Sequence, residues 1–422
     1  MSAHLAMPVP GPVPPAHRAQ HLLGCPNCGT LQRIPPAASF DVLDCAACGT
    51  GIDRLTGRSV TAALACAAAA FLLLIPANLL PLMTTSLVGV SRESHLGSSA
   101  RVMFERGYPE LGLAIGLMVV VLPLLRFGLL TAVLGALRLG RRPAWLGRVF
   151  RYDETLQTWA MADVFLLGFV VAYERLDQTL PVLIGTGALC FVAAAILGLF
   201  TRATLDRGAV WRAIAPDRPV SAGEAVLVCR GCEQTLPAAC EGGQCPRCQT
   251  RLRRRIPDSL VKTGALVIAA ALLYLPANVY PIATLPIGLT SVKYTVIQGI
   301  IDLFESKLYG LAGLVFVASF AIPFLKVVAV AWCVVSVLRR SRRRLVAKTR
   351  LYRVVDEIGR WSMVDPFVIA CFVPVTQYNT LVHGSAEAAA PAFTAVVILT
   401  MIATRCFDPR LLWDPLHAGT NR

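Results

Sequence analysis

The chain carries one phrase twice, 200 positions apart. Residues 75–90 read IPANLLPLMTTSLVGV, and residues 275–290 read LPANVYPIATLPIGLT. Matches at a fixed spacing indicate an internal duplication. The chain must therefore fold into two similar units. At the same spacing, Phe104-Glu105 matches Phe304-Glu305 and "PLLR" (123–126) matches "PFLK" (323–326). At a spacing of 202, "WAMADVF" (159–165) matches "WSMVDPF" (361–367).

Each unit is apolar enough to lie in a membrane. Of the 422 residues, 55% are hydrophobic and only 15% are charged, which is less charge than soluble domains carry. A membrane-spanning helix needs about 20 mostly apolar residues. We predict eight spans, four in each unit, of which 160–173 and 364–378 are the shortest. They cover residues 60–82, 111–137, 160–173, 182–200, 263–282, 311–338, 364–378 and 389–404.

The number of spans determines how the two units are related. Four is even, so each unit enters and leaves the membrane on one side, and the units should be parallel repeats about an axis along the membrane normal. The predicted fold is an all-α polytopic membrane protein with two parallel four-helix transmembrane repeats, each preceded by a small zinc ribbon. The predicted domains are a disordered proline-rich N-terminus (1–20), the first ribbon (21–57), the first transmembrane repeat (58–205), the second ribbon (206–256), the second transmembrane repeat (257–408) and a cytosolic tail (409–422).

Prolines and an asparagine mark the end of the first span in each repeat. Proline removes a backbone donor and interrupts a helix, and an asparagine beside it can bond to the carbonyls that the break frees. We expect this structural role, although broken helices also line binding sites in transporters. The residues concerned are Pro76, Asn78, Pro81, Pro276, Asn278 and Pro281.

Positive charge lies mainly beside the predicted spans. The segments 138–151 and 339–353 carry five and eight basic residues, whereas the four loops on the opposite side hold six in total. Basic loops stay in the cytoplasm, so both termini and both cysteine-rich segments are predicted to be cytoplasmic. A basic protein can also bind nucleic acid, but charge in these positions indicates topology and contact with lipid headgroups. We expect no nucleic-acid partner.

Two C-x-x-C pairs precede each repeat. Four thiolates from two tight turns complete a tetrahedral zinc site, and disulfides are disfavoured in the cytoplasm. Four cysteine ligands leave no position open for water or substrate, which favours a structural role for two zinc ions over redox or iron-bearing sites. Cys240 is a spare thiol that could replace a ligand in the second set. The predicted ligands are Cys25, Cys28, Cys45 and Cys48, and then Cys229, Cys232, Cys245 and Cys248.

Polar residues inside the second repeat form a candidate functional centre. Ser319 and Lys326 are spaced to share one face of the sixth span, and Ser362 and Asp365 share a face at the start of the seventh. Ionisable groups in a span are costly and mark functional sites. Asp365 is a candidate partner of Lys326. The pair could be a structural link between helices, or a centre that gates a path or relays protons.

The first repeat has a weaker set of polar residues. It offers Pro123, Arg126 and Asp163 at the matching positions but lacks both serines. We therefore expect the active centre in the second repeat.

Several separate motifs resemble the paraquat-inducible protein A family. They are YLPANVYPIAT (274–284), GIIDLFE (299–305), ASFAIPFLK (318–326), LYRVVDEIGRWSMVDPF (351–367) and the two cysteine ribbons, within roughly 20–408. The resemblance implies a multi-pass protein of the Gram-negative inner membrane. It implies that the protein moves lipid, expected to be phospholipid, together with a periplasmic MCE-domain tunnel protein. It also implies a polar centre made by Ser319, Lys326, Ser362, Asp365 and Thr400.

The chain lacks the usual signatures of an enzyme. It contains no G-x-x-x-x-G-K-[ST] loop and no G-x-S-x-G elbow, and its six histidines do not cluster in sequence. We therefore expect a lipid transporter subunit and not an enzyme. Two alternatives are a non-transporting membrane scaffold for the tunnel and a zinc- or redox-sensing membrane protein.

Overall fold

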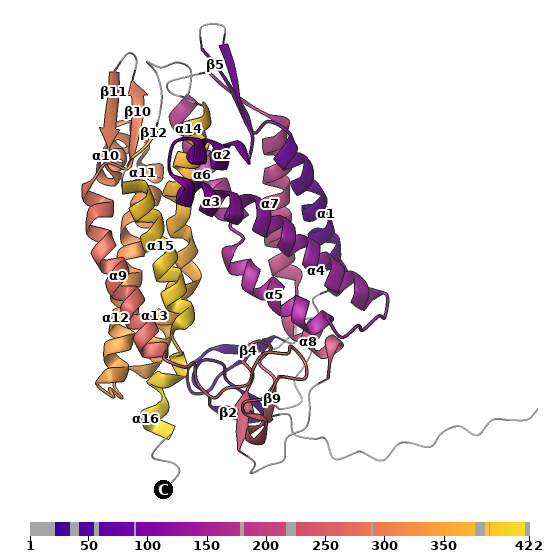
Figure 1. Ribbon diagram of the computed structural model, residues 1–422. Coiled ribbons are helices and arrows are strands. Elements are labelled where there is room, and N and C mark those ends of the chain that lie inside the picture. The colour runs from indigo at the N-terminus through magenta and orange to yellow at the C-terminus, as the bar shows by residue number, and fades with distance from the viewer. Residues whose placement is uncertain are drawn as a thin grey trace, which may run out of the picture.

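Two helical bundles stand side by side in the computed structural model (Figure 1). Strands lie at both ends of the bundles, as β-hairpins at one end and as the small cysteine ribbons at the other. We call these the hairpin end and the ribbon end. The predicted disordered N-terminus, 1–20, lies outside the residues that the structure describes. Those residues are 22–33, 42–54, 59–87, 90–177, 181–216, 225–287, 290–375, 385–387 and 389–417.

The first bundle contains four long helical segments. In this bundle α1 packs against α4 and α7, and α4 packs against α5. The side chain of Ser59 caps α1 by accepting from the Ala62 N–H. The segments are α1 (Val60–Leu79), the continuous α3 (Pro109–Ile115), π-helix η1 (Gly116–Val121) and α4 (Leu122–Arg138), then α5 (Leu146–Trp159) with α6 (Ala162–Asp177), and α7 (Thr186–Thr204).

The second bundle repeats this plan. Here α9 packs against α12 and α15, as α1 does against α4 and α7. The segments are α9 (Ser259–Val279), the continuous α11 (Tyr309–Val315), π-helix η3 (Phe316–Ala321) and α12 (Ile322–Leu338), then α13 (Leu345–Ile358), 3-10 helix η4 (Gly359–Met363) and α14 (Val364–Val375), and α15 (Ala389–Cys406). The prediction of two four-helix repeats is therefore confirmed.

Seven helices of the described chain are long and apolar enough to cross a membrane. The seventh predicted span, 364–378, corresponds to α14, which has 12 residues and is about 18 Å long. It is too short to span alone, and residues 376–378 lie outside the described part. Because α14 continues α13 through η4, as α6 follows α5, the repeat keeps its four-segment plan.

A small antiparallel sheet covers the hairpin end of each bundle, which the sequence analysis did not predict. The orders are β6-β5-β7 and β11-β10-β12. The predicted span 182–200 needs correction, because residues 182–184 pair with β5 as a strand and the helix begins only at Thr186. Both sheets lie at one end in Figure 1, so the repeats are parallel. The strands are β5 (Met83–Leu87), β6 (Val90–Ser94), β7 (Val182–Ile184), β10 (Ala283–Ile287), β11 (Thr290–Tyr294) and β12 (Ser385–Ala386).

A short helix follows each hairpin. These helices are α2 (Ser98–Glu105) and α10 (Val296–Glu305). A capping box starts α10, since Thr295 and Gln298 bond to each other's backbone N–H. Ile297 and Phe304 of α10 are exposed, so this helix presents an apolar face at the hairpin end.

The proline-asparagine motif lies partly inside the helices and not only at their ends. Pro76 and Pro276 are within α1 and α9, which each run three residues further. The expectation that these two prolines end the helices is therefore wrong, since the remaining N–H groups of the last turn still find helical carbonyls. The helices end before Pro81 and Pro281. The asparagine side chains bond within their own helices, where Asn78 donates to the Leu74 carbonyl at 2.6 Å and Asn278 donates to the Tyr274 carbonyl at 2.8 Å.

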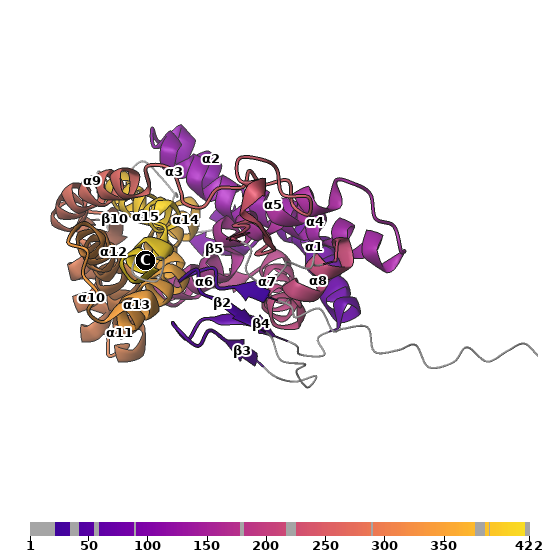
Figure 2. The same cartoon turned by 90° about the horizontal axis from the view of Figure 1, so that it is seen from below.

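The two bundles meet through α6 and α14, which lie between them when the molecule is seen from below (Figure 2). The rings of Phe165 and Phe367 contact each other edge to face, with centroids 5.5 Å apart. These phenylalanines occupy matching positions in the two repeats. Their contact with each other is what a two-fold axis between the repeats requires, and Gly168 leaves room for the close approach of Phe367.

The ribbons are built from short hairpins at the ribbon end. They also contact each other, because the Gly24 N–H donates to Thr235 Oγ1 at 3.3 Å. The first ribbon contains β1 (Leu22–Gly24), β2 (Leu31–Arg33), β3 (Val42–Asp44) and β4 (Gly51–Arg54). The second contains β8 (Val226–Val228), β9 (Thr235–Pro237) and 3-10 helix η2 (Ala238–Cys240).

Each ribbon docks on the repeat that it does not precede. Arg353 on α13 of the second repeat donates to the Gly49 carbonyl of the first ribbon at 3.1 Å. Arg151 on α5 of the first repeat donates to the Cys248 carbonyl of the second ribbon at 3.2 Å and to Thr250 Oγ1 at 3.0 Å. The two arginines are 202 positions apart, so the crossed docking follows the internal repeat.

Gly147 allows the second ribbon to approach α5 closely. A Cβ at this position would lie 1.9 Å from the Arg247 carbonyl oxygen, and backbone cannot move aside as a side-chain tip can. We expect Gly147→Ala to lower the free energy of unfolding by about 1–3 kcal/mol, measured by thermal denaturation. Gly135→Ala is the control, because no atom lies within 4 Å of its added Cβ, and it should be neutral or stabilising. Equal stability of the two variants would contradict this docking.

Candidate functional site

Two groups of four cysteines are arranged as metal sites. In each group the sulfur atoms all lie within 4.8 Å of one another. Pairs taken from different knuckles are 3.5–3.6 Å apart, close to the roughly 3.8 Å expected for thiolates around a tetrahedral zinc ion. All eight are 5% exposed or less. Each predicted set could therefore hold a metal ion, whereas Cys240 is exposed and belongs to neither group.

A backbone carbonyl is the centre of the polar cluster in the second repeat. Lys326 Nζ donates to the Gly359 carbonyl oxygen at 3.2 Å, and Ser362 Oγ donates to the same oxygen at 2.7 Å. Gly359 begins η4, which contacts α12, α15 and η3. Lys326 is 1% exposed and Ser362 is 0% exposed. The structure thus brings these two predicted residues together.

Ser319 lies beside this cluster in the π-helix η3. Pro323 has no N–H, so it cannot donate to the carbonyl of Ser319 four residues earlier. The hydroxyl oxygen of Ser319 is also buried and has no hydrogen-bond partner among the described residues. π-helices of this kind often occur at functional sites. The Ser319 hydroxyl is therefore a buried polar group without a partner in an irregular part of this helix.

Asp365 and Thr400 fit the predicted centre less well. The sequence interpretation offered Asp365 as a candidate partner of Lys326. The hydrogen bond that the structure gives the Lys326 ammonium group goes to the Gly359 carbonyl of η4, and a pairing with Asp365 stays a prediction. Thr400 on α15 is 1% exposed and donates to the Val397 carbonyl of its own helix at 2.9 Å.

The first repeat has a buried ion pair where the second has Lys326. Arg126 Nε lies 3.8 Å from Asp153 Oδ1, and both side chains are at most 5% exposed. The sequence comparison named Asp163 as the acid of the first repeat and did not consider Asp153. Asp153 lies on α5 in the segment YDET, and its place on the buried face of that helix could have been recognised from the helical spacing.

Asp163 instead connects the two repeats. Its Oδ2 lies 2.8 Å from Arg360 Nη2 of the second repeat and 3.5 Å from Arg202 Nη1 of the first. Arg202 in turn lies 3.3 Å from Glu357 Oε1 on α13. Arg360 directly follows Gly359, so a carboxylate of the first repeat holds the segment that carries the polar centre of the second.

The comparisons with known proteins agree with this two-part structure. The family described as "Paraquat-inducible protein A" matches residues 60–215 and 260–417, one match for each repeat. The chain belongs to the paraquat-inducible protein A family. Three relatives of this family are similar along almost the whole chain.

The first relative is "Intermembrane transport protein PqiA" of Escherichia coli K12, which is 31% identical and aligns over 94% of this chain and 96% of its own length. The second is "Lipophilic envelope-spanning tunnel protein A" of the same organism, which is 32% identical over 94% of this chain and 92% of its length. The third is "Probable intermembrane transport protein" of Haemophilus influenzae, which is 26% identical over 93% of this chain and 95% of its own length. No solved structure matches the chain.

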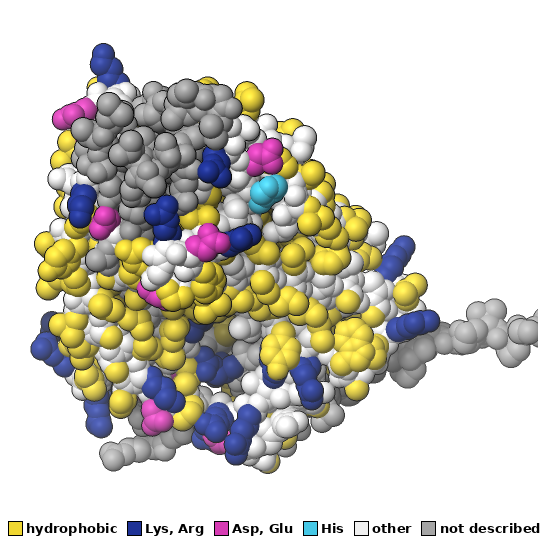
Figure 3. Space-filling view, turned by 45° about the horizontal axis from the view of Figure 1, so that its top comes forward, with side chains coloured by type: hydrophobic (Ala, Val, Ile, Leu, Met, Phe, Trp, Pro, Cys, Tyr) yellow, Lys and Arg dark blue, Asp and Glu magenta, His cyan; other side chains and the backbone are white. Residues whose placement is uncertain are grey.

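The family member described by this structure is an integral membrane protein with a role in intermembrane transport. Figure 3 shows apolar side chains in a broad band across one face, with most Lys and Arg toward its edges. Exposed apolar side chains of the bundle helices include Leu72 of α1 (64%), Leu272 of α9 (67%) and Phe324 of α12 (53%). Such a surface is stable in lipid and not in water.

Loss of the Asp163 charge should weaken the contact between the two repeats and so lower the stability of the protein. We expect Asp163→Asn to lower stability by about 3 kcal/mol, because Arg360, 11% exposed, would lose the carboxylate that compensates its buried charge. Glu241→Gln is the control, since Glu241 pairs with Arg254 at an exposed site and should change stability by less than about 1 kcal/mol. Thermal unfolding in detergent measures both. If the two variants unfold together with the wild type, the repeats are not coupled through Asp163.

Proposed function

We propose that this chain passes phospholipid between the inner membrane of a Gram-negative cell and a periplasmic MCE-domain tunnel protein. The observation that supports the proposal is the buried ammonium group of Lys326, which is held by the carbonyl of a broken helix inside an apolar bundle. A buried charge at this depth is costly and is kept where it serves transport. The chain acts in this role without catalysing a reaction.

The proposed lipid path lies in the second repeat, at the polar centre. The segment from Ser319 to Lys326 contacts η4, and within this segment Pro323 and the π-helix η3 weaken the regular backbone hydrogen bonds. Movement of η4 away from α12 would free the Gly359 carbonyl, Lys326 and Ser362 to meet a polar headgroup. The names of two relatives, which refer to intermembrane transport, support transport as the activity.

The orientation and the metal are part of the same proposal. The ribbon end lies in the cytoplasm, since the basic segments 138–151 and 339–353 belong to that end. We propose that both chain termini are cytoplasmic too. Zinc is the metal that best suits two closed sets of four thiolates. Its role would be to stabilise the fold of each small ribbon. The ribbon carbonyls that accept hydrogen bonds from Arg151 and Arg353 are then held in place.

A scaffold that anchors the tunnel without moving lipid is the second candidate function. The observation that favours it is the tight packing of the polar centre, because Ser319 and Ser362 are both 0% exposed. The third candidate, a redox sensor, would need accessible sulfur atoms. The eight ribbon sulfurs are buried, which counts against it.

Gly359→Ala tests the proposed transport with little change to the fold. An added Cβ would lie 2.7 Å from Lys326 Cε and 2.9 Å from Nζ, so it would displace the lysine tip, while the φ of −57° at Gly359 suits alanine. We expect lipid transfer from proteoliposomes to the purified partner to fall about tenfold. In α11, Gly313→Ala adds a Cβ with no neighbour within 4 Å and should transfer normally. Normal transfer by Gly359→Ala, or none by the wild type, would favour the scaffold.

A further inference from the structure

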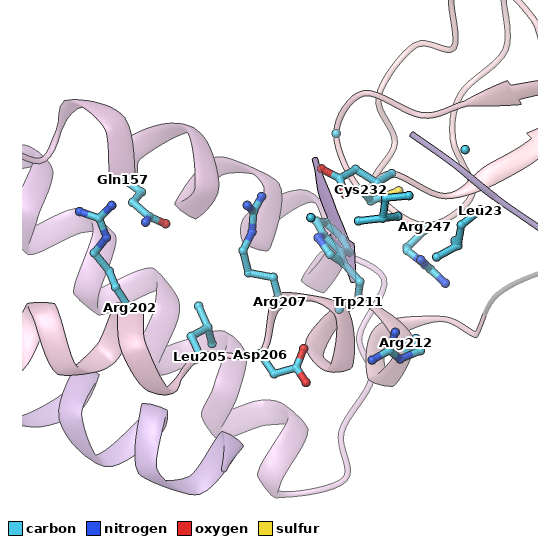
Figure 4. Close-up of a pocket in the computed structure, with 16 residues that line it drawn as sticks. Leu23, Gln157, Arg202, Leu205, Asp206, Arg207, Trp211, Arg212, Cys232 and Arg247 are labelled. Atoms are coloured by element: carbon cyan, nitrogen blue, oxygen red, sulfur yellow. The ribbon is translucent and has the colours of Figure 1, made fainter. Parts of the chain in front are cut away.

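A groove of about 340 Å³ lies at the ribbon end, where both ribbons meet α7 and α8 (Arg207–Ile214) (Figure 4). Two of its arginines are paired within the protein. Arg202 Nη1 lies 3.5 Å from Asp163 Oδ2, and Arg207 Nε lies 2.6 Å from Glu154 Oε1. These two arginines therefore serve the protein's own contacts. At the opposite end of the molecule, α10 presents an apolar surface that the described residues do not cover.

Helix α10 has three faces. The first is buried, because the helix packs on α11 and η3, and Leu303 lies in a cluster with Val171 of α6. The second is an apolar stripe with the i, i+4, i+7 spacing that places side chains on one side of a helix. It consists of Ile297, Ile301 and Phe304, which are 47%, 48% and 60% exposed. The third face has the same spacing and is polar and exposed, and it consists of Gln298, Asp302 and Glu305.

The apolar stripe lies beside a membrane-spanning segment and not above it. That segment, Tyr309–Leu338, has 30 residues and is about 45 Å long, which exceeds the roughly 30 Å of a bilayer's hydrocarbon core. Helix α10 contacts η3, which begins about 10 Å from the start of the segment. Phe316 and Val317 of η3 are themselves about half exposed. The stripe therefore continues the apolar surface that the bundle presents to lipid.

Two tyrosines mark the level of the membrane surface at this height. Tyr280 follows the last residue of α9, Tyr309 begins α11, and both side chains are 57% exposed. Tyrosine is enriched where a membrane protein crosses from acyl chains to headgroups. The ring of Tyr309 also contacts that of Phe304 edge to face, with centroids 4.9 Å apart. The stripe of α10 is thus at the depth where an amphipathic helix binds a bilayer.

The matching helix of the first repeat lacks this stripe. Both helices lie toward the hairpin end (Figure 1). The residues 200 positions before Ile297, Ile301 and Phe304 are Gly97, Arg101 and Phe104. The Arg101 side chain is 82% exposed, and its Nε lies 2.8 Å from Glu105 Oε1 of the same helix. The internal repeat has therefore kept the helix, whereas the apolar stripe occurs only in the second repeat.

We propose that α10 is an interfacial helix that binds the phospholipid surface at the hairpin end. Its apolar stripe inserts among the acyl chains, and its polar face stays with the headgroups and water. Helix α2 makes no such insertion, because Arg101 stands in the middle of the corresponding face. Since α10 contacts η3, which carries Ser319, the lipid that it binds lies beside the polar centre. The proposal concerns lipid contact alone and does not rest on the proposed transport.

The test uses a fluorescent amino acid in the full chain, placed at position 301, 302 or 101 in three separate proteins. Each is reconstituted into vesicles of phosphatidylcholine that carries bromine on the upper part of its acyl chains, because bromine quenches fluorescence only at short range. We expect position 301 to lose at least about half of its intensity, and positions 302 and 101 to lose little. All three side chains are exposed, so the label should not disturb the core. Hydrogen exchange in α9 like that of the wild type shows that each labelled protein is folded.

Two results would overturn the proposal. Equal quenching at positions 301 and 101 would show that both helices are merely near the membrane and that the stripe has no special contact with lipid. Absence of quenching at position 301 would show that the stripe lies outside the acyl chains. In the second case the purified tunnel partner is added, and a blue shift of the emission at position 301 would identify a protein, and not lipid, as the occupant of the stripe.

Discussion

The double variant Cys25→Ser/Cys28→Ser should unfold the first ribbon. Helices of the second repeat at the ribbon end should then lose protection from hydrogen exchange, while those of the first repeat keep it. If the thiolates hold zinc, as proposed above, the metal contributes roughly 10–16 kcal/mol to the folding of such modules, so the ribbon should not fold without its thiolates. The second repeat would then lose the bond of Arg353 to the Gly49 carbonyl and that of Arg410 Nε to the Pro26 carbonyl at 2.9 Å. Hydrogen exchange in α13 should rise about tenfold or more, while exchange in α5 changes little.

The second ribbon provides the matched control for this result. Cys229→Ser with Cys232→Ser should raise exchange in α5, where Arg151 grips the Cys248 carbonyl, and should leave α13 protected. The two double variants therefore predict opposite patterns on one molecule. If each variant exposes the repeat that directly follows its own ribbon, the crossed docking is wrong.

Methionine at Lys326 should strongly lower lipid transfer without lowering stability. Methionine has a similar length and fills the same space, and the Gly359 carbonyl keeps its bond from Ser362. Removing a buried charge can even stabilise a protein. A hydrogen bond to a charged group contributes about 1.5–3 kcal/mol, which corresponds to a loss of transfer of about tenfold to a hundredfold if lipid uses that group during passage. A purely structural lysine predicts lower stability instead.

Lys348→Met is the control for this prediction. Lys348 is also buried, at 3% exposed, but it lies at the ribbon end and donates to Ser341 Oγ at 3.1 Å. Its replacement should leave transfer from proteoliposomes within about twofold of the wild type. An equal loss of transfer in the two variants would show that any buried lysine matters only for folding.

The architecture was predictable because the patterns that indicate it can be read directly along the sequence. Apolar runs such as α9, and motifs that recur 200 to 202 positions apart, can be recognised without knowledge of distant contacts. The hairpins were missed because β10 contains Pro286 and becomes a strand only by pairing with β11 and β12, the second of which lies about 100 residues away. The crossed docking depends on the contacts of Arg151 and Arg353, which join segments 97 and 304 positions apart.

The polar centre was predictable in its residues but not in its bonds. Helical spacing placed Ser319 and Lys326 on one face, and both are buried near η4. A sequence shows side-chain acids but not free carbonyls, so the bond from Lys326 to the Gly359 carbonyl was not foreseen. For the same reason the link from Asp163 to Arg360 was not foreseen, since it joins two repeats that the sequence treats separately.

Photocrosslinking in cells tests most directly whether lipid passes through the second repeat. One variant carries a photoreactive amino acid at position 319. A second carries it at position 119, the matching buried site of the first repeat. After irradiation, the adducts of each variant are purified and analysed by lipid mass spectrometry. The account predicts phospholipid adducts from position 319 and only background from position 119. Adducts at position 119 alone, or none at either position while the partner protein still co-purifies, would contradict it.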